Sequence, residues 1–460
     1  MDSSRKKSLL LLITNSYAAI NIIHSGLIKP LASEYDIRLI SSLIGKRELS
    51  EINKHFNIQM QQIQVPLFEE SYLLRFLRQL EKAVFFHHFR IETQKIKDQQ
   101  SSILYRYAVD ILLSLIASIR LTSGLLKLLR KIIILFTGKN RHVKSWNLPD
   151  FDGVISTSPL DIRENTIVNH LKIKSTPSLA IVISWDNLTS KGIINANHDC
   201  VLVWNQFMAQ EYDLFYKVFN ITKQKIFITG VPRFDVYYKP LPPQYAAESI
   251  RNKFNISNEH KVMLFATSAL NHCPNQVDIL EHLLEYAAHH SSATILVRCH
   301  PADDYRKYSR FENEQNFRIW HSEKTSLNQT FSNTIPDLDV LLNLASMLKT
   351  CDVCIQIAST IRLEAAICNK PCICIAYDGN EILPESHSVK RFYSYSHQIP
   401  LNKLGLDQFA YSKPELFLTL DKLLDHAPKV DHTDKIQKFV HHTAPESVAI
   451  TMKYIREWLS

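Results

Sequence analysis

Short apolar runs alternate with polar, helix-forming stretches along the first 65 residues of the chain. Apolar runs at 9–13, 37–42 and 60–65 predict buried strands, and the segments 17–33 and 48–56 between them predict helices. This alternation is typical of βαβ units, whose strands pair into a parallel sheet. The pattern therefore predicts an α/β fold from the start of the chain.

Residues 69 to about 148 interrupt this alternation. Strong helix formers follow one another there with few turn signals, and a strand returns only at 154–156. We therefore expect a helical insertion at about 69–148 inside the first α/β domain.

Strand-like runs continue on both sides of a Pro-Leu-Pro-Pro segment at 240–243, which we interpret as a linker. A single hydrophobic core stops growing near ~250–300 residues, so 460 residues predict two domains. We expect one domain at 1–240, a second at 241–435, and a closing helix in 436–460 that packs back on the first. The further strands are expected at 180–184, 200–203, 225–229, 261–266, 293–298, 317–320, 353–356 and 372–375.

The composition fits an ordinary globular protein. Forty-five per cent of the residues are apolar and 21% are charged, and 9 glycines with 18 prolines exclude fibrous and largely disordered classes. The opening segment imitates a signal peptide, but Thr14, Asn15 and Ser16 interrupt its short apolar core. No charge-free apolar run reaches the ~18–20 residues of a membrane span. We expect a cytoplasmic protein without a transmembrane helix.

Eight cysteines at irregular spacing do not form the disulfide framework of a small secreted domain. Cys351 and Cys354 have CxxC spacing, but no second CxxC and no histidine pair completes a zinc site. We expect reduced thiols, most of them buried in strands, and no bound metal.

Positive charge is concentrated between residues 111 and 149, where no Asp or Glu occurs. On a helix over 111–136, three of the cations would lie within roughly 40° of one another, with apolar residues over the rest. A basic amphipathic helix of this kind favours peripheral contact with an anionic membrane or with a partner protein. The alternative is a helix packed on its own domain with solvated lysines. Nucleic-acid binding is not expected, since the segment is not rich in aromatic residues. The cations are Arg120, Lys127, Arg130, Lys131, Lys139, Arg141 and Lys144.

Two segments of the second half carry candidate chemistry. An apolar strand ends at His300-Pro301, and a strand at 353–357 runs into Ala358, Ser359 and Thr360 before a helix that contains Glu364. A histidine at a strand end can donate a hydrogen bond to a phosphate, and the N-terminus of a helix attracts anions. Glu364 could bind ribose hydroxyls. The alternatives are a turn-capping histidine and an N-capped helix with a first-turn acid.

Polar residues also follow strands of the first half. Asp186, Asn187 and Lys191 follow the strand at 180–184, where Asp186 could act as a general base towards an acceptor hydroxyl; an Asx-turn explains the same letters. Ser16, after the first strand, is a further acceptor-side candidate. Arg233 stands in a Gly-x-Pro-Arg-x-Asp turn, where it either pairs with Asp235 or reaches a donor phosphate.

Taken in order, four motifs resemble the GT-B transferases that build bacterial surface polymers, in particular the CDP-glycerol glycerophosphotransferase group with its polysialyl- and Kdo-transferase relatives. That group's Trp-His-Gly-Thr-Pro-Leu-Lys motif is matched by residues 185–191, its Gly-Tyr-Pro-Arg-Asn-Asp element by 230–235, its His-Pro by 300–301 and its Asp-Tyr-Ser-Ser by 358–360. The resemblance runs from about 185 to 378. It implies a GT-B fold with two Rossmann-like domains facing across a cleft, metal-independent chemistry, and donor contacts from His300, Ser359 and Thr360.

Departures from that pattern narrow the expected function. Asp186 replaces the group's histidine, and its reference pKa is lower; Glu364 resembles the ribose-binding acid of sugar-nucleotide GT-B enzymes. We expect a glycosyltransferase that moves a sugar from a nucleotide-sugar donor to a glycan or lipid-linked acceptor in surface-polysaccharide synthesis at the membrane, with no cofactor. Asp186 and His300 are the expected catalytic residues, and Arg233, Ser359, Thr360 and Glu364 the expected donor contacts. The alternatives are a CDP-glycerol-type glycerophosphotransferase and a non-catalytic membrane-associated scaffold.

Overall fold

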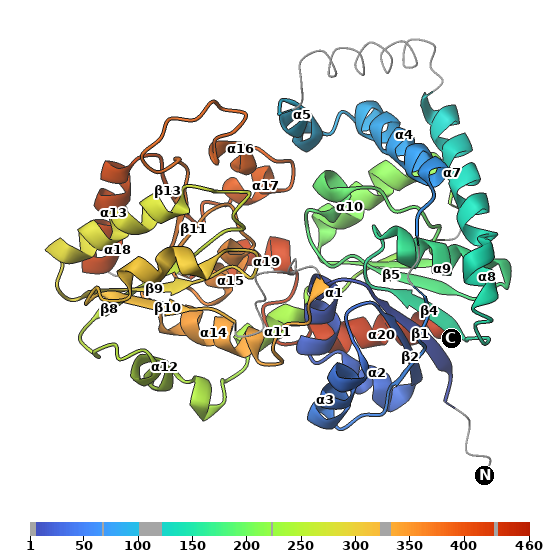
Figure 1. Cartoon of the computed structure of the whole chain (residues 1–460), viewed down its shortest axis with the longest axis horizontal. Coiled ribbons are helices and arrows are strands. Elements are labelled where there is room, and N and C mark those ends of the chain that lie inside the picture. Colours follow the sequence, from blue (N-terminus) through green and yellow to red (C-terminus); the bar gives the residue numbers. More distant parts are fainter. Residues whose placement is uncertain (1–5, 67–68, 101–121, 222–223, 323–332, 427–430) are drawn as a thin grey trace. The chain divides into compact units, whose positions relative to one another are not determined.

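The computed structural model describes residues 6–66, 69–100, 122–221, 224–322, 333–426 and 431–460 (Figure 1). The chain divides into two compact units. Unit 1 holds residues 1–233 together with 446–460, and unit 2 holds residues 234–445.

Unit 1 is built on a parallel sheet of seven strands in the order β3-β2-β1-β4-β5-β6-β7. Residues 9–13 of the central strand β1 are all fully buried, as expected for a continuous apolar strand covered on both faces. The strands are β1 (Ser8–Ile13), β2 (Asp36–Ser41), β3 (Gln61–Gln62), β4 (Gly153–Ser156), β5 (Ser178–Ile181), β6 (Cys200–Val203) and β7 (Lys225–Ile228).

Helices connect these strands in the βαβ manner. The predicted helix over 17–33 is divided into α1, η1 and α2, with Gly26 at a φ of +82° before α2. The helices outside the segment between β3 and β4 are α1 (Ser16–Ala19), η1 (Ile20–His24), α2 (Ile28–Glu34), α3 (Lys46–Phe56), α9 (Ile162–Ile173), η2 (Asn187–Lys191), α10 (Gln206–Tyr216), η3 (Lys217–Phe219), η4 (Pro232–Phe234) and α20 (Ser447–Leu459).

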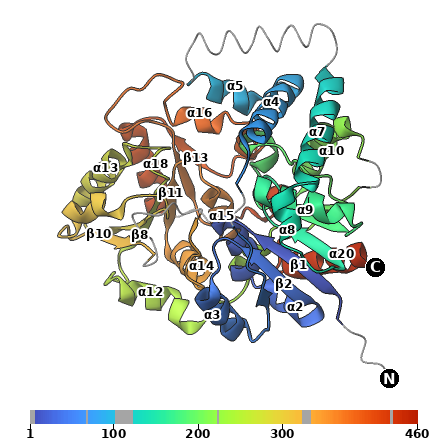
Figure 2. The ribbon, with the colours of Figure 1, turned by 45° about the vertical axis from the view of Figure 1, so that its right-hand side comes forward.

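Between β3 and β4 the described chain is helical. The long helices α4 (Tyr72–Phe89) and α7 (Thr122–Gly138) pack side by side, and the shorter α5 (Glu92–Asp98) and α8 (Arg141–Ser145) flank them (Figure 1, Figure 2). A fully buried ion pair joins the two long helices, with Arg130 Nε 2.8 Å from Glu81 Oε1. The Arg130 guanidinium also lies 3.7 Å from the centre of the Phe219 ring.

This ion pair corrects the expected basic surface. Arg130 faces inward, because its charge is compensated by Glu81 on the neighbouring helix rather than by solvent. Arg120 lies outside the described residues. Lys127 is partly exposed, and the cations that are exposed are Lys131, Lys139, Arg141 and Lys144.

The final helix α20 belongs to unit 1, although it follows the whole of unit 2 in the sequence. Arg456 forms a two-pronged ion pair with Glu34 at the end of α2, with N–O distances of 2.8 and 2.6 Å. Tyr454 stacks on Phe227 of β7 with ring centroids 4.2 Å apart. The closing helix therefore covers the first sheet.

Unit 2 contains a parallel sheet of six strands in the order β10-β9-β8-β11-β12-β13. Its edge strand β13 was not predicted. The strands are β8 (Lys261–Ala266), β9 (Ala293–Arg298), β10 (Phe317–Trp320), β11 (Val353–Gln356), β12 (Cys372–Ile375) and β13 (Gln408–Ala410). The helices are α11 (Asp235–Tyr238), η5 (Pro243–Tyr245), α12 (Ala247–Lys253), α13 (Gln276–His289), η6 (Tyr305–Phe311), α14 (Val340–Thr350), α15 (Ile361–Ile367), α16 (Lys390–Tyr393), α17 (Gln398–Asn402), α18 (Lys413–His426) and α19 (Thr433–Val440).

Two parallel sheets with connecting helices confirm the predicted α/β class with two Rossmann-like domains. Within the part of the chain that the structure describes, none of the helices has the length and apolar character needed to cross a bilayer.

Candidate functional site

His300 lies just past the carboxyl end of β9 in unit 2. Its backbone N–H donates to Thr267 Oγ1 at 2.8 Å, and its Nδ1 accepts from the Ala302 N–H at 3.0 Å. Because Nδ1 accepts a backbone hydrogen bond, the neutral imidazole carries its proton on Nε2. The ring is therefore oriented with Nε2 as a hydrogen-bond donor.

A buried carboxylate, Asp303, fixes the turn that carries His300. It accepts hydrogen bonds from Thr267 Oγ1 at 2.7 Å, Tyr308 Oη at 2.8 Å and Gln276 Nε2 at 2.9 Å. Burial raises the pKa of Asp303 above its usual value, and the Thr267 and Tyr308 hydroxyls oppose that rise. The sequence interpretation did not include Asp303, although the His-Pro-Ala-Asp-Asp segment contained the signal.

The turn between β11 and α15 carries the other predicted donor residues. Ala358 has a φ of +42°, an unfavourable left-handed conformation for a residue with a Cβ. Its N–H donates to Tyr393 Oη at 2.9 Å, and the Ser359 N–H donates to Gln356 Oε1 at 2.7 Å. Ser359 and Thr360 are partly exposed at this turn. Thr360 is the N-cap of α15, but its side chain makes no capping hydrogen bond.

Glu364 lies one turn further along α15 and is only 3% exposed. The helix that carries it is anchored by the fully buried Arg362, whose Nε donates to Asp407 Oδ2 at 2.9 Å and whose Nη1 donates to Gln398 Oε1 at 2.6 Å. Glu364 is thus held on a fixed element, with its side chain almost wholly buried.

These residues gather at one edge of the unit 2 sheet. All its strands are parallel, so the turns after β8, β9 and β11 lie at the same edge. Strand order reverses between β8 and β11, and ligands of doubly wound sheets bind outside the carboxyl ends of the strands at such a switch point. Thr267, His300 and Ser359 follow β8, β9 and β11 respectively.

Asp186, Asn187 and Lys191 form a second group, in unit 1. Asp186 Oδ1 accepts from Ser184 Oγ at 2.7 Å and from Asn187 Nδ2 at 3.4 Å, and Asp186 Oδ2 lies 3.4 Å from Lys191 Nζ. The chain here forms the π-helical turn η2, with Asp186 as its N-cap. The structure therefore brings the predicted base together with both neighbouring acceptor-side candidates.

Ser16 and Arg233 are positioned differently. Ser16 begins α1 after β1 but is fully buried, so its side chain is not presented to solvent. Arg233 is partly exposed at the end of unit 1, with its guanidinium carbon 5.8 Å from the centre of the Trp204 ring.

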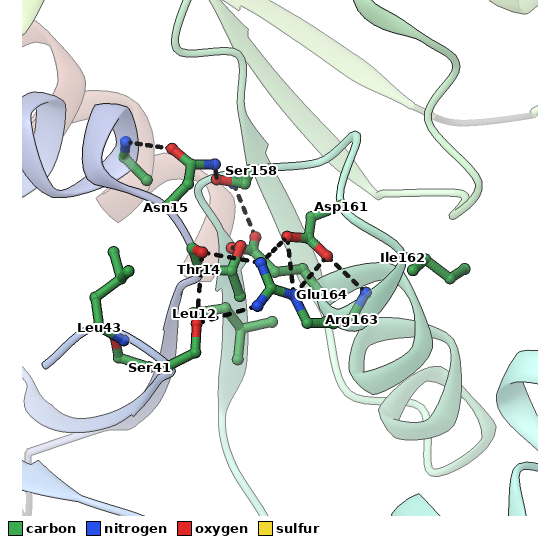
Figure 3. Close-up of polar contacts among 12 residues, drawn as sticks. Leu12, Thr14, Asn15, Ser41, Leu43, Ser158, Asp161, Ile162, Arg163 and Glu164 are labelled. Atoms are coloured by element: carbon green, nitrogen blue, oxygen red, sulfur yellow. Dashed lines mark hydrogen bonds and ion pairs between the residues drawn. The ribbon is translucent and has the colours of Figure 1, made fainter. Parts of the chain in front are cut away.

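Sequence reasoning missed a polar network at the switch point of the unit 1 sheet, between β1 and β4 (Figure 3). Its centre is Glu164, a fully buried carboxyl on α9. It accepts from Thr14 Oγ1 at 2.7 Å, Ser156 Oγ at 2.7 Å and the Ser158 N–H at 2.8 Å. This carboxyl ties the ends of β1 and β4 to the first turn of α9. The sequence analysis made no prediction for Glu164, because an acid in the first turn of a helix is common.

A possible metal-ligand group also occurs among the described residues. Cys372, Cys374 and Asp407 bring one ligand atom each within 4.8 Å of one another. The buried Arg362 is ion-paired with Asp407, however, and burial raises the pKa of the Cys374 thiol well above its usual value. A guanidinium beside protonated thiols disfavours a cation, so we assign no metal to this group.

Solved structures identify the fold. The chain is similar to a protein from Listeria monocytogenes described as a UDP-N-acetylglucosamine 2-epimerase, with a TM-score of 0.56, 10% identity and coverage of 98% of this chain and 96% of that one. It is also similar to S. aureus MnaA in a co-structure with UDP (TM-score 0.53, 11% identity, 98% and 97% covered) and to the Neisseria meningitidis UDP-GlcNAc 2-epimerase bound to UDP-GlcNAc (TM-score 0.54, 11% identity, 98% and 100% covered). The chain has the GT-B fold of two Rossmann-like domains.

A family model matches part of the sequence and adds information beyond the fold. Residues 187–385 match the family model described as CDP-Glycerol:Poly(glycerophosphate) glycerophosphotransferase. This match covers less than half of the chain, and together with the GT-B fold it confirms the predicted resemblance to the surface-polymer transferases. The matched segment contains Asn187, Lys191, Arg233, His300, Ser359, Thr360 and Glu364, and Asp186 immediately precedes it. Comparison with curated proteins finds no match.

The buried Glu164 predicts a pH-dependent stability. Its pKa rises from 4.5 to about 7 because burial, and secondarily the nearby Asp161, disfavour the charged form. The unfolded chain therefore releases the Glu164 proton at lower pH than the folded chain. The protonated carboxyl stabilises the folded state fully below pH 4.5, and this contribution is lost as the pH rises through about 7. We expect the free energy of unfolding of the wild type to fall by about 2–3 kcal/mol between pH 5 and 8 relative to Glu164→Gln.

Urea unfolding at both pH values measures this difference. Glu259→Gln is the control, since Glu259 is exposed and removed from the network. Parallel pH profiles for the wild type and Glu164→Gln would show that the carboxyl is not the titrating group.

Proposed function

We propose that the protein is a glycosyltransferase that moves a sugar from a nucleotide-sugar donor to an acceptor hydroxyl in surface-glycan synthesis. The observation that carries the proposal is the coincidence of the family match with the strand-end residues of unit 2. His300, Ser359, Thr360 and Glu364 all lie inside the matched segment, around the switch point where doubly wound sheets bind ligands.

The strand-end residues of unit 2 suit the binding of a nucleoside diphosphate. His300 offers Nε2–H to a phosphate oxygen, and the Ser359 and Thr360 hydroxyls offer further donors. Fixed donors stabilise the charge that develops on a departing phosphate. Glu364 would accept hydrogen bonds from ribose hydroxyls, and Arg233 would contribute a further cation. Solved structures of the same fold that contain UDP or UDP-GlcNAc support this donor class.

The unit 1 residues suit activation of the acceptor. Asp186 would accept the proton of the acceptor hydroxyl, whose oxygen forms a bond to the anomeric carbon while the bond from that carbon to the donor phosphate breaks. The Lys191 ammonium lies 3.4 Å from Asp186 Oδ2, and the Ser184 hydroxyl orients the carboxylate. Asn187 and Lys191 would contact the acceptor. The reaction as proposed needs no metal ion.

A CDP-glycerol-type glycerophosphotransferase is the second candidate, because the matched family model carries that description. The same unit 2 residues would then hold a cytidine diphosphate donor, and the same Asp186 would receive the acceptor proton. The donor site contains the acid Glu364 beside the hydroxyl residues Ser359 and Thr360. Because Glu364 resembles the ribose-binding acid of sugar-nucleotide enzymes, it favours a nucleotide-sugar donor over CDP-glycerol.

Calorimetric titration with UDP, GDP, CMP and CDP tests the donor site. We expect one nucleoside diphosphate to bind. His300→Ala and Glu364→Gln should each weaken that binding by about tenfold or more, since each substitution removes a hydrogen bond to a charged or buried group. His289→Ala is the control, because His289 is exposed on α13. Selective binding of CDP would favour the glycerophosphotransferase, whereas no binding by the folded wild type would favour a non-catalytic scaffold.

Asp186→Asn tests the acceptor chemistry. We expect Asp186→Asn to leave nucleotide binding unchanged and to lower transfer activity by about 10²–10⁴-fold, as for loss of a general base. Both activities are measured with EDTA present, because the proposed reaction needs no metal ion. The matched control is Asp213→Asn on the exposed face of α10. Equal activities of the two variants would rule out Asp186 as the base.

We further propose that the protein acts in the cytoplasm at an anionic membrane, through the helices α4 and α7. The outward face of α7 combines the exposed apolar side chains Leu128, Leu135 and Phe136 with the exposed Lys131. On α4, Leu73 and Phe76 are 52% and 63% exposed. Apolar side chains interleaved with lysines suit the interface of an anionic bilayer.

Sedimentation with vesicles tests this contact. We expect the protein to bind phosphatidylserine-containing vesicles, to release them as salt rises, and to ignore pure phosphatidylcholine. The double variant Leu128→Asp, Leu135→Asp should bind at least about tenfold more weakly. Its control is Leu214→Asp, Leu418→Asp, which changes two leucines of similar exposure on α10 and α18. Equal loss in both double variants would contradict a specific role of α7.

A further inference from the structure

A surface pocket of about 560 Å³ opens in unit 1 beside the switch point of its sheet. One wall comes from the start of α4, with Glu69, Glu70, Tyr72 and Arg75, and the other from the β4–α9 turn, residues 161–163. Its volume lies within the range of about 300–1,000 Å³ that is typical of small-molecule sites. None of the residues considered for the nucleotide donor lines it.

The β4–α9 wall is rigidly built (Figure 3). Asp161 accepts from the Arg163 N–H at 2.9 Å and from Arg163 Nε at 3.0 Å, so it caps α9 and holds the guanidinium. Arg163 Nη2 also donates to the Thr14 carbonyl at 2.9 Å, and Nη1 to Ser42 Oγ at 3.1 Å. Ile162 points away from this network (Figure 3). The wall is therefore preorganised before any ligand arrives.

The α4 wall combines a fixed carboxylate with an exposed aromatic ring. Glu70 Oε1 lies 2.7 Å from Arg78 Nη1, and Glu70 Oε2 lies 3.6 Å from Arg75 Nε. Tyr72 is 89% exposed, and the Arg75 guanidinium lies 5.9 Å from the centre of its ring. An aromatic ring this exposed provides a flat apolar surface beside polar groups.

The charges of the lining select the class of ligand. Glu70 pairs with Arg78 and Arg75, and Asp161 pairs with Arg163, so both guanidinium groups of the lining already face a carboxylate. Because these cations are ion-paired, the lining offers no uncompensated positive charge to a phosphate or a carboxylate, which favours an uncharged ligand. Carboxylates accept hydrogen bonds from hydroxyl groups, guanidinium groups donate to hydroxyl oxygens, and an aromatic ring packs against the C–H face of a pyranose.

We infer that this pocket binds a neutral sugar residue of the acceptor glycan. The inference rests on the proposed glycosyltransferase function and specifies its acceptor: a chain whose bound unit is an uncharged sugar rather than a polyol phosphate or an acidic sugar. Tyr72 stacks on the ring, and Glu70, Asp161 and Arg163 bind its hydroxyl groups.

An array of neutral, sialylated, uronate-containing and phosphorylated glycans, probed with the fluorescently labelled full chain, tests the inference. We expect retention on neutral glycans only. Tyr72→Ala, and Ile162→Trp, which fills the pocket, should weaken retention by about tenfold or more. The control Tyr411→Ala removes an aromatic ring that is 53% exposed in unit 2 and outside the pocket, and it should change retention less than about twofold. Thermal unfolding verifies that all three variants are folded.

Retention on anionic glycans, no retention on any glycan, or equal effects of Tyr72→Ala and Tyr411→Ala would overturn the inference. Nucleotide titration of the same wild-type preparation separates it from the proposed function. Nucleotide binding without glycan binding refutes the pocket alone. Neutral-glycan binding that depends on Tyr72, without nucleotide binding, supports the pocket and refutes the transferase.

Discussion

The physical constraint on which the structure depends is the complete burial of its parallel strands. Helices flank both sheets, and central strands such as β1 and β8 are almost wholly inaccessible. Such strands tolerate few polar side chains, because a buried polar group needs a hydrogen-bond partner. Polar chemistry is therefore displaced to the turns that follow the strands, and parallel orientation brings these turns to one edge of each sheet. The candidate residues gather there for this reason.

Both units stabilise that edge with the same device. In unit 1 the first residue after β1, Thr14, donates its hydroxyl proton to the buried Glu164, and in unit 2 the first residue after β8, Thr267, donates to the buried Asp303. Each carboxylate also binds groups of the next strand along the sheet or of the turn beyond it. Burial raises the pKa of both groups, to about 7 for Glu164. A carboxyl that accepts several hydrogen bonds fixes several turns at once, at the expense of desolvating its own charge.

The sequence was sufficient where the pattern was local. The strands over 261–266, 293–298 and 353–356 were predicted with their observed bounds, since each is a continuous apolar run between polar turns. The edge strand β13 was missed, because three residues carry too little pattern. Glu164 was missed and Arg130 was wrongly placed on a basic surface for a common reason. Their letters fit a helix acid and a solvated cation, and only tertiary packing supplies the partners Thr14 and Glu81. Local periodicity cannot identify which charge will meet its counter-charge inside the protein.

The two proposals for unit 1 meet on α4. Its first turn, with Tyr72 and Arg75, lines the pocket, and Phe76, further along the same helix, is exposed outside the pocket and is part of the proposed membrane contact. The cations of the pocket are ion-paired, whereas α7 carries the exposed Lys131, and this difference suits one extended acceptor with two chemically different ends. In the proposed acceptor, a lipid-linked glycan, the membrane-embedded end is anionic and the growing end is an uncharged sugar. Lys131 would attract the anionic end, and the pocket, without an uncompensated cation, would hold the uncharged sugar, which fixes the direction in which the acceptor binds.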